Sequence, residues 1–184
     1  MKTIIASLAA LCLVFIFFSC PVSAQSKEEA IRLTKEGEAL QEQARSKDDL
    51  ERAAEKYKQA LRIYERLRDD KGILLEASSL GRVYGELGEY DKALEYCDTC
   101  VNVSRKTGHA GMEAECLFNL AKSYELRYQS KEDVERAIEK YEQALKIYER
   151  LSKEEPIAST NLSLGITYDR LGQYEKQWHI SRNA

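Results

Sequence analysis

The chain has few of the residues that interrupt helices or build catalytic and metal sites. Its 184 residues include only two prolines, Pro21 and Pro156, and only two histidines. Proline is the strongest helix breaker, and the abundant Ala, Glu, Leu, Lys and Arg are good helix formers. The sequence also lacks a glycine-rich phosphate loop and a histidine-rich metal pattern. We therefore predict an all-α protein that is not an enzyme and that needs no cofactor or metal.

Neither sign of charge dominates the chain. It has 28 Lys and Arg residues against 31 Asp and Glu residues, for a net charge of −3. The two signs are interspersed along the sequence and form no block. Surfaces that bind nucleic acids or anionic membranes are usually strongly basic. We therefore expect no nucleic-acid partner.

One long apolar run occurs, at residues 4–18, and it is close to the start of the chain. Lys2 precedes it, and the small residues Val22-Ser23-Ala24 follow it. This pattern predicts a secretory signal peptide over residues 1–24, because the run is shorter than the roughly 20 residues of a membrane span. We expect export through the secretory pathway, to the periplasm or the medium if the source is bacterial. An uncleaved membrane anchor and lipidation at Cys20 remain as alternatives.

The rest of the chain repeats itself at a shift of 84 residues. Glu51–Leu67 reads ERAAEKYKQALRIYERL and Glu135–Leu151 reads ERAIEKYEQALKIYERL, with 14 of 17 positions identical. The same shift carries Leu80–Tyr90 onto Leu164–Tyr174. A long fixed-period repeat predicts a stack of similar units, each in contact with its neighbours. Such stacks bind other molecules far more often than they catalyse reactions.

Apolar residues recur at three- and four-residue steps from Lys27 onward, which is the periodicity of amphipathic helices. We predict one domain over residues 25–184, with units at about 27–68, 72–106, 112–152 and 156–184. The eight predicted helices cover residues 27–45, 49–68, 72–87, 90–106, 112–128, 133–152, 156–171 and 174–181.

Small residues predict how the helices pair. Gly81 and Ala93 should face each other within one helix pair, because a missing side chain lets two helix axes approach to about 8 Å. The matching positions are Ala53, Ala137 and Gly165. Tyrosines should fill the larger gaps between helices, at Tyr57, Tyr84, Tyr141 and Tyr168.

These residues carry a family resemblance. The pattern Leu-Gly-x-x-Tyr-x-x-Leu-Gly-x-Tyr-x-x-Ala, complete at Leu80–Ala93, resembles the tetratricopeptide repeat. Units one and three have additional residues between their helices, around 46–50 and 130–134, so the spacing is nearer 40 residues than the usual 34. That spacing resembles kinesin light chains, Leu-Gly-Asn-repeat adaptors and bacterial repeat arrays. The resemblance implies a right-handed α-solenoid of about four antiparallel helix pairs, the last one incomplete.

The resemblance also implies a function and a site. Proteins of this family are non-catalytic interaction modules, and the first helix of each pair lines a concave groove for a peptide or protein segment. The groove positions map here to Thr34, Glu38, Gln41, Ser78, Arg82, Phe118, Asn119, Lys122, Glu125, Leu162, Ile166 and Asp169. The alternative function is a structural or assembly factor of the cell envelope, anchored by lipid at Cys20 or self-associating through its uncapped last unit. The partner of such a module is a protein or peptide that the sequence does not identify.

Three cysteines remain after the predicted signal peptide, and an odd number excludes a disulfide scaffold. Cys97 and Cys100 spell C-x-x-C, but they lie in the middle of a predicted helix, where packing is their simplest role. The repeat fold places Cys100 near the first helix of the next unit, where Cys116 lies. A second interpretation of these cysteines is therefore a Cys100–Cys116 disulfide. A zinc site is a third, with His109 as the one nearby additional ligand.

Overall fold

The computed structural model describes the backbone of residues 26–182 and the side chains as far as Gln173. The predicted signal peptide lies outside the described residues. Within them the protein consists of seven α-helices without a strand. The helices are an N-terminal helix over residues 26–42, α2 (Lys47–Leu67), α3 (Asp70–Leu87), α4 (Tyr90–Thr107), α5 (Ala110–Arg127), α6 (Lys131–Arg150) and α7 (Glu154–Arg182).

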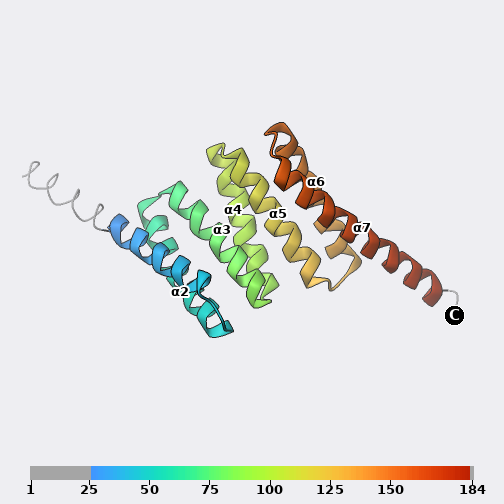
Figure 1. The fold of residues 1–184 in the computed structure, drawn as a ribbon, viewed down its shortest axis with the longest axis horizontal. Helices are drawn as coiled ribbons and strands as arrows, with labels where there is room; N and C mark the ends of the chain where they lie inside the picture. Colours follow the sequence, from blue (N-terminus) through green and yellow to red (C-terminus); the bar gives the residue numbers. More distant parts are fainter. Residues whose placement is uncertain (1–25, 183–184) are drawn as a thin grey trace, which may run out of the picture.

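The helices form an elongated stack in which each packs against the next along the chain (Figure 1). The N-terminal helix lies toward one end of the stack and α7 at the other. Helices α3 and α5, the first helices of two successive units, also contact each other directly. The predicted all-α solenoid of helix pairs is therefore confirmed, and the first six helices lie within three residues of their predicted positions.

The additional residues in units one and three begin the helices α2 and α6. Ser46 caps α2 by accepting a hydrogen bond from the Asp49 backbone N–H, and Asp49 accepts one in return from the Arg45 N–H. Ser130 and Asp133 repeat this arrangement at the start of α6. Each reciprocal cap satisfies backbone donors that a helix start leaves unpaired, so these inserts define where the second helix begins.

Glycine has two different roles in the turns. Gly88 ends α3 in the left-handed conformation, with φ of 78°, and so allows α4 to fold back within two residues. The helix that we predicted to begin at residue 72 begins at Asp70, so Gly72 lies inside the first turn of α3. A Cβ atom on Gly72 would overlap the ring of Tyr64, so this glycine permits close packing. The turn before α3 instead uses Arg68, which adopts the left-handed conformation.

The core contains the predicted tyrosines and small residues, with two exceptions on α7, Tyr168 and Gly165. Tyr57 and Tyr141 are completely buried and Tyr84 is 7% exposed, but Tyr168 is 48% exposed. The alanines of the helix pairs are also fully buried, at Ala53, Ala93 and Ala137. The prediction of a buried Tyr168 is wrong, because no following helix covers that side of α7 among the described residues.

The end of the stack differs from the prediction in one more respect. We predicted a break near Gly172 and a separate helix over residues 174–181. Instead α7 continues without interruption for 29 residues, from Glu154 to Arg182. The last unit therefore has a first helix that runs on past the point where unit two turns.

The cysteines lie at helix contacts. Cys100 on α4 and Cys116 on α5 are joined as a disulfide with their Cα atoms 5.8 Å apart, across the boundary between units two and three. Cys97 is a buried free thiol, and burial raises its pKa to about 12. A thiol with so high a pKa is a poor nucleophile at neutral pH, so the C-x-x-C spacing here serves packing and cross-linking.

Arg127 on α5 also joins neighbouring helices. Its guanidinium donates to Asp133 at 2.5 Å, at the start of α6, and to Asp91 at 2.8 Å, in the first turn of α4. The Asp133 side chain is nearly buried, and the hydrogen bond from Arg127 holds the pKa of that carboxyl below its usual range. The contact orients three successive helices at one edge of the stack.

A buried carboxyl connects the N-terminal helix to α3. Glu76 is completely buried, and its Oε1 accepts a hydrogen bond of 2.5 Å from the hydroxyl of Thr34. Its Oε2 has no hydrogen-bond partner in the described part of the chain. Burial, with a further contribution from the negative charge of Glu38, raises the pKa of Glu76 to about 7. Burying the ionised carboxylate without a partner costs folding free energy, whereas burying the neutral acid costs less.

We predict that Gly81→Leu destabilises the protein by roughly 1–3 kcal/mol, because it overpacks a tight helix contact. A Cβ atom on Gly81 would lie 2.5 Å from the Cys97 Sγ. The matched control is Gly85→Leu, one turn further along α3, where a Cβ atom would meet no atom within 4 Å. Urea unfolding of both variants measures the difference. Equal unfolding midpoints would contradict this helix pairing.

We also predict that stability falls as the pH rises from about 4.5 to about 7. The carboxyl of Glu76 has an ordinary pKa of 4.5 and a folded pKa of about 7, so the folded state binds more protons in this window. The loss is about 1–3 kcal/mol, complete above the folded pKa.

Glu76→Gln should remove this component, because glutamine keeps an acceptor for Thr34 and carries no charge. Urea unfolding at pH 4.5, 6 and 8 should therefore show the parent losing stability relative to the variant. Identical pH profiles for the two proteins would mean that the Glu76 carboxyl titrates near its ordinary value in the folded state.

Candidate binding groove

Two adjoining pockets lie along the first helices of units one to three. The first pocket, of about 380 Å³, lies between the N-terminal helix and α3 and reaches Tyr57 of α2. The second, of about 270 Å³, lies between α3 and α5. Arg82 and Glu86 of α3 line both pockets and form the wall between them. We call the two pockets together the groove.

A hydrogen-bonded chain organises the floor of the first pocket. The Gln41 carbonyl oxygen accepts from the Tyr57 hydroxyl at 3.1 Å and from the Arg82 guanidinium at 3.2 Å. The Gln41 amide donates in turn to Glu86 at 3.1 Å. Burial raises the pKa of Tyr57 to about 12, so this hydroxyl remains a donor at neutral pH.

Carboxylates outnumber cations in the first pocket. Glu38, Glu42 and Glu86 contribute three, against the single guanidinium of Arg82. Glu38 is exposed at the rim. The pocket therefore favours a cationic side chain, which carboxylates bind through charge-assisted hydrogen bonds.

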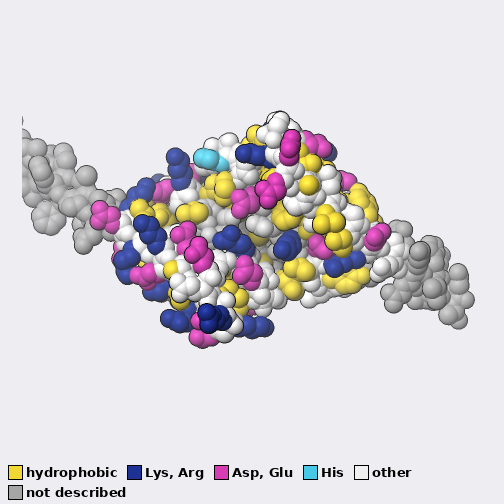
Figure 2. All heavy atoms as spheres, viewed as in Figure 1, with side chains coloured by type: hydrophobic (Ala, Val, Ile, Leu, Met, Phe, Trp, Pro, Cys, Tyr) yellow, Lys and Arg dark blue, Asp and Glu magenta, His cyan; other side chains and the backbone are white. Residues whose placement is uncertain are grey.

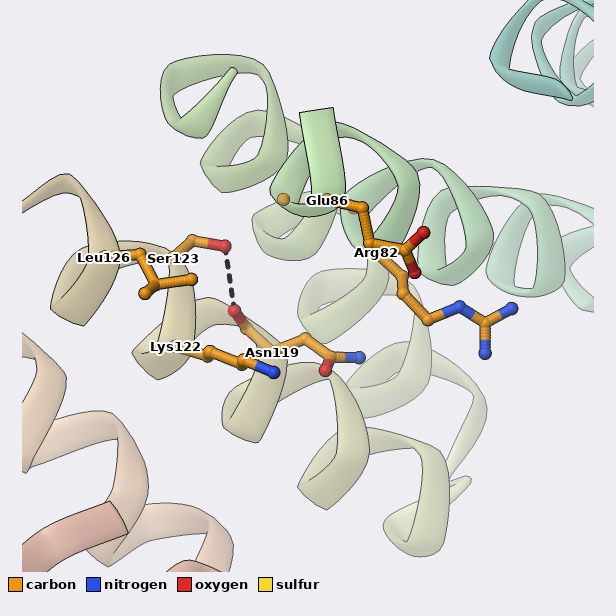
Figure 3. A pocket seen from close by; sticks show the side chains of 8 residues that line it. Arg82, Glu86, Asn119, Lys122, Ser123 and Leu126 are labelled. Carbon is orange, nitrogen blue, oxygen red and sulfur yellow. Dashed lines mark hydrogen bonds between the residues drawn. The ribbon is translucent and has the colours of Figure 1, made fainter. Parts of the chain in front are cut away.

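The second pocket has the opposite character. Figure 3 shows Asn119, Lys122 and Leu126 on α5, and Arg82 and Glu86 on α3 with their charged ends directed away from α5. Both charged ends contact Gln41 in the first pocket. Gly81 and Gly85 line the α3 side, and a Cβ atom on Gly85 would meet nothing within 4 Å, so its absence leaves room there. Two cations, an amide and one carboxylate are among the residues that line it, beside the 40%-exposed Leu126. The pocket suits an acidic or amide-bearing group with an apolar neighbour.

The structure brings five of the predicted groove residues together in this groove. They are Glu38, Gln41, Arg82, Asn119 and Lys122. Sequence reasoning missed Glu42, Glu86 and Leu126, each of which lies four residues after a predicted member and so on the same helix face. Extending each predicted position by one helical turn would have found them.

Thr34 does not line the groove. Its side chain is 5% exposed, and its hydroxyl donates to the Ala30 carbonyl and to Glu76. The residue is therefore part of the contact between the N-terminal helix and α3. Ser78 is half-buried and lines neither pocket.

Phe118 and Glu125 are also engaged within the protein. Phe118 packs edge-on against the ring of Tyr141, with centroids 5.3 Å apart. Glu125 accepts a hydrogen bond of 2.8 Å from the Tyr141 hydroxyl and pairs with Arg170 of α7 at 3.2 Å. Neither residue lines the two pockets, and both contact helices that approach this part of α5.

The three predicted residues on α7 form a separate surface. Leu162, Ile166 and Asp169 are exposed and line neither pocket. The groove that the structure shows therefore covers units one to three only.

Two other kinds of site are absent from the described residues. They contain no group of three or more His, Cys, Asp or Glu side chains that could hold a metal ion. None of the helices in this part of the chain is both long and apolar enough to cross a membrane. Figure 2 shows acidic and basic side chains intermingled on one face of the molecule, with scattered hydrophobic patches.

Comparison with known proteins agrees with the fold and its repeats. Residues 78–107 and 117–155 match models of the tetratricopeptide repeat. The crystal structure of BtubC (BKLC) from P. vanneervenii is similar, with a TM-score of 0.60 and 25% sequence identity over 89% of this chain and 72% of that chain. Comparison with curated protein sequences gives no match. The matched segments lie mainly over the helix pairs α3–α4 and α5–α6, so these two units of the chain are tetratricopeptide repeats.

Proposed function

We propose that this protein is an adaptor whose groove binds an extended segment of a partner protein. Tetratricopeptide repeats generally mediate protein–protein interaction, and the repeats match two units of this chain. The observation that carries the proposal is the pair of adjoining pockets that share Arg82 and Glu86. A continuous polar groove across three helices fits a chain segment better than a compact small molecule.

The distance between the two pockets sets the distance between the ligand side chains that enter them. Packed helices lie roughly 8–10 Å apart, so neighbouring pockets between successive helices are separated by about the same distance. An extended chain advances about 3.3 Å per residue. The two pockets would therefore receive side chains about three residues apart on the partner.

Charge then selects those two side chains. The first pocket, with Glu38 and Glu42 at its rim, accepts Lys or Arg. The second, with Arg82 and Lys122, accepts Asp, Glu or a polar amide, and Leu126 offers an apolar contact beside it. These charges are solvent-accessible, so they contribute mainly to specificity and association rate.

The test compares two charge reversals of equal size. Arg82→Glu/Lys122→Glu inverts the cations of the second pocket, whereas Lys35→Glu/Lys146→Glu changes two exposed lysines outside both pockets. Each is used as bait in native extract, and captured proteins are identified by mass spectrometry. We expect the groove variant to recover its partner at least tenfold less, a difference of about 1.4 kcal/mol in binding free energy.

The control variant should recover the partner as well as the parent does, and circular dichroism should show equal melting for all three proteins. The partner segment should then bind the parent less tightly as salt rises. Equal recovery by both variants would place the binding surface outside the groove and overturn the proposal.

We further propose that the protein is exported and that residues 1–24 are removed. The apolar run at 4–18 and the small residues before Gln25 support this. The adjacency of Cys100 and Cys116 adds support, because structural disulfides persist in oxidising compartments and are rare in the cytosol.

The expected native product begins at Gln25 and has one thiol, that of Cys97, when unfolded without reductant. Reduction should raise the count to three, since residues 25–184 contain three cysteines. Intact-mass measurement and thiol alkylation of the native protein check both points. Three thiols before reduction would contradict the disulfide, and an acylated product beginning at Cys20 would indicate a lipid anchor instead.

A further inference from the structure

One carboxyl is buried where the first two units meet, outside the groove. Glu76 of α3 is completely buried and lines neither pocket, and its Oε2 has no hydrogen-bond partner in the described part of the chain. Shifts of 40 and 84 residues, which align the repeats, place Glu76 on Cys116 of α5 and Thr160 of α7. Both of these residues are also buried, and neither carries a charge. The stacking of units therefore does not require an ionisable side chain at this repeat position.

The hydrogen-bond geometry around Glu76 favours a proton on the carboxyl. The Thr34 Oγ1 atom lies 3.0 Å from the Ala30 carbonyl oxygen and 2.5 Å from the Glu76 Oε1. A hydroxyl group has one hydrogen to donate, so beside an ionised carboxylate it must divide that hydrogen between two acceptors. Both bonds are complete when the hydroxyl donates to Ala30 and a protonated Glu76 donates to the hydroxyl oxygen. The contact between the N-terminal helix and α3 is therefore strongest with the neutral acid.

The ionisable groups that face Glu76 give it no counter-charge. Burial raises the pKa of Glu76, and the negative charge of Glu38 on the N-terminal helix raises it further. On α2, Tyr57 and Tyr64 face the carboxyl, and burial and the negative charge of Glu76 raise the pKa of both hydroxyls. These hydroxyls therefore stay neutral at neutral pH.

The other contacts of α3 supply no cation at this place either. Helix α4 meets α3 at Cys97 and Cys100, and neither sulfur is charged at neutral pH, because one has a pKa of about 12 and the other is in the disulfide. The Arg82 guanidinium donates to Gln41 in the first pocket, and Lys122 of α5 lines the second pocket. Ionisation of Glu76 would thus leave a buried charge without a counter-ion among the described side chains.

The N-terminal helix that covers Glu76 also forms one wall of the first pocket. Glu38, Gln41 and Glu42 come from this helix, and the other lining residues come from α2 and α3. The helix lies toward one end of the described stack (Figure 1), where a repeat array opens most readily. Release of the helix would bring Glu76 into contact with water and would separate the two walls of the pocket.

We propose that a proton on Glu76 holds the N-terminal helix against α3 and thereby assembles the first pocket of the groove. In mildly acidic solution the helix is docked and the pocket is complete. In mildly basic solution the carboxyl ionises, the helix is released and the pocket loses the wall that contains Glu38, Gln41 and Glu42. This regulation rests on the proposed function for what the pocket binds, whereas the movement of the helix does not.

Proton linkage gives the size of the effect. The docked carboxyl has a pKa of about 7, and the released carboxyl has the ordinary value of 4.5. The docked state binds more protons between these values, so docking weakens as the pH rises through this window. Between pH 6 and pH 8 the equilibrium constant for release increases about tenfold.

Alkylation of a thiol on the buried side of the helix measures its release. Ala30→Cys introduces that thiol at a completely buried position that packs with residues of α2, so iodoacetamide reaches it only when the helix opens. The native thiol of Cys97, buried between α3 and α4, is the internal reference. Each labelling rate is divided by the rate at the same site in urea-unfolded protein at the same pH, and peptide mapping separates the two sites.

We expect the corrected rate at position 30 to rise about tenfold from pH 6 to pH 8 and to exceed that of Cys97 at both values. Adding Glu76→Gln should reduce the rise to less than about twofold, because glutamine does not ionise. The matched control is Glu28→Gln, which removes an exposed carboxyl from the same helix and should keep the full rise.

Three results would overturn the proposal. An unchanged rate in the parent, or an equal rise with Glu76→Gln, would mean that this carboxyl does not control the helix. Equal corrected rates at position 30 and at Cys97 would mean that the helix opens only with the whole protein. None of these measurements needs a partner, so they are independent of the groove test.

The consequence for the groove is measured with the partner segment that the groove test identifies. The parent should bind this segment more weakly at pH 8 than at pH 6, and Glu76→Gln should show a smaller difference. The same pH dependence in both proteins would show that release of the helix does not reach the groove, and it would overturn the regulation. A groove without any partner would instead refute the proposed function, while the labelling rates still decide whether Glu76 controls the helix.

Discussion

The structure depends on close contact between the two helices of each unit at a residue with little or no side chain. Gly37 receives the ring of Tyr57, and Gly81 receives the sulfur of Cys97. These contacts set the distance between helix axes, and so the distance between one unit and the next. Because each unit buries its face only against its neighbours, an error at one such contact would be transmitted to the groove that successive first helices form. Arg82 and Glu86 directly follow Gly81 and Gly85 in the sequence, on the side of α3 that this packing leaves open.

Local chemistry explains how much of the fold could be predicted. The apolar period, the Ser46 and Ser130 caps and the Gly88 turn each depend on neighbours in sequence, and the first six helices were placed correctly. The continuity of α7 could not be predicted in the same way. A glycine such as Gly172 permits a left-handed turn but does not require it. Whether the chain folds back depends on the packing energy of the helix that follows, which no local pattern contains.

Only some of the groove residues were predicted correctly, because a local pattern gives the helix face but not the contacts that cover it. Glu38, Gln41 and Lys122 lie on the predicted face and remain accessible. Thr34, one turn before Glu38, is buried because successive positions four residues apart differ by about 40° around a helix. That rotation is enough to move a side chain from the rim into the contact with α3. Phe118 packs against Tyr141 of the following helix, α6, and is partly buried by that contact. The pattern of one helix alone does not show how the hairpin closes over it.

The Cys100–Cys116 link lies at the boundary between units two and three rather than within a unit. Repeat arrays open from their ends, one unit at a time, because each unit depends on its neighbours alone. A covalent connection between the two middle units prevents their separation, so opening from either end would stop there. Amide hydrogen exchange should then be slowest and most uniform over α4 and α5, with protection declining toward both ends. The oxidation state of one cysteine pair would thus decide whether the array unfolds gradually or keeps a persistent central block.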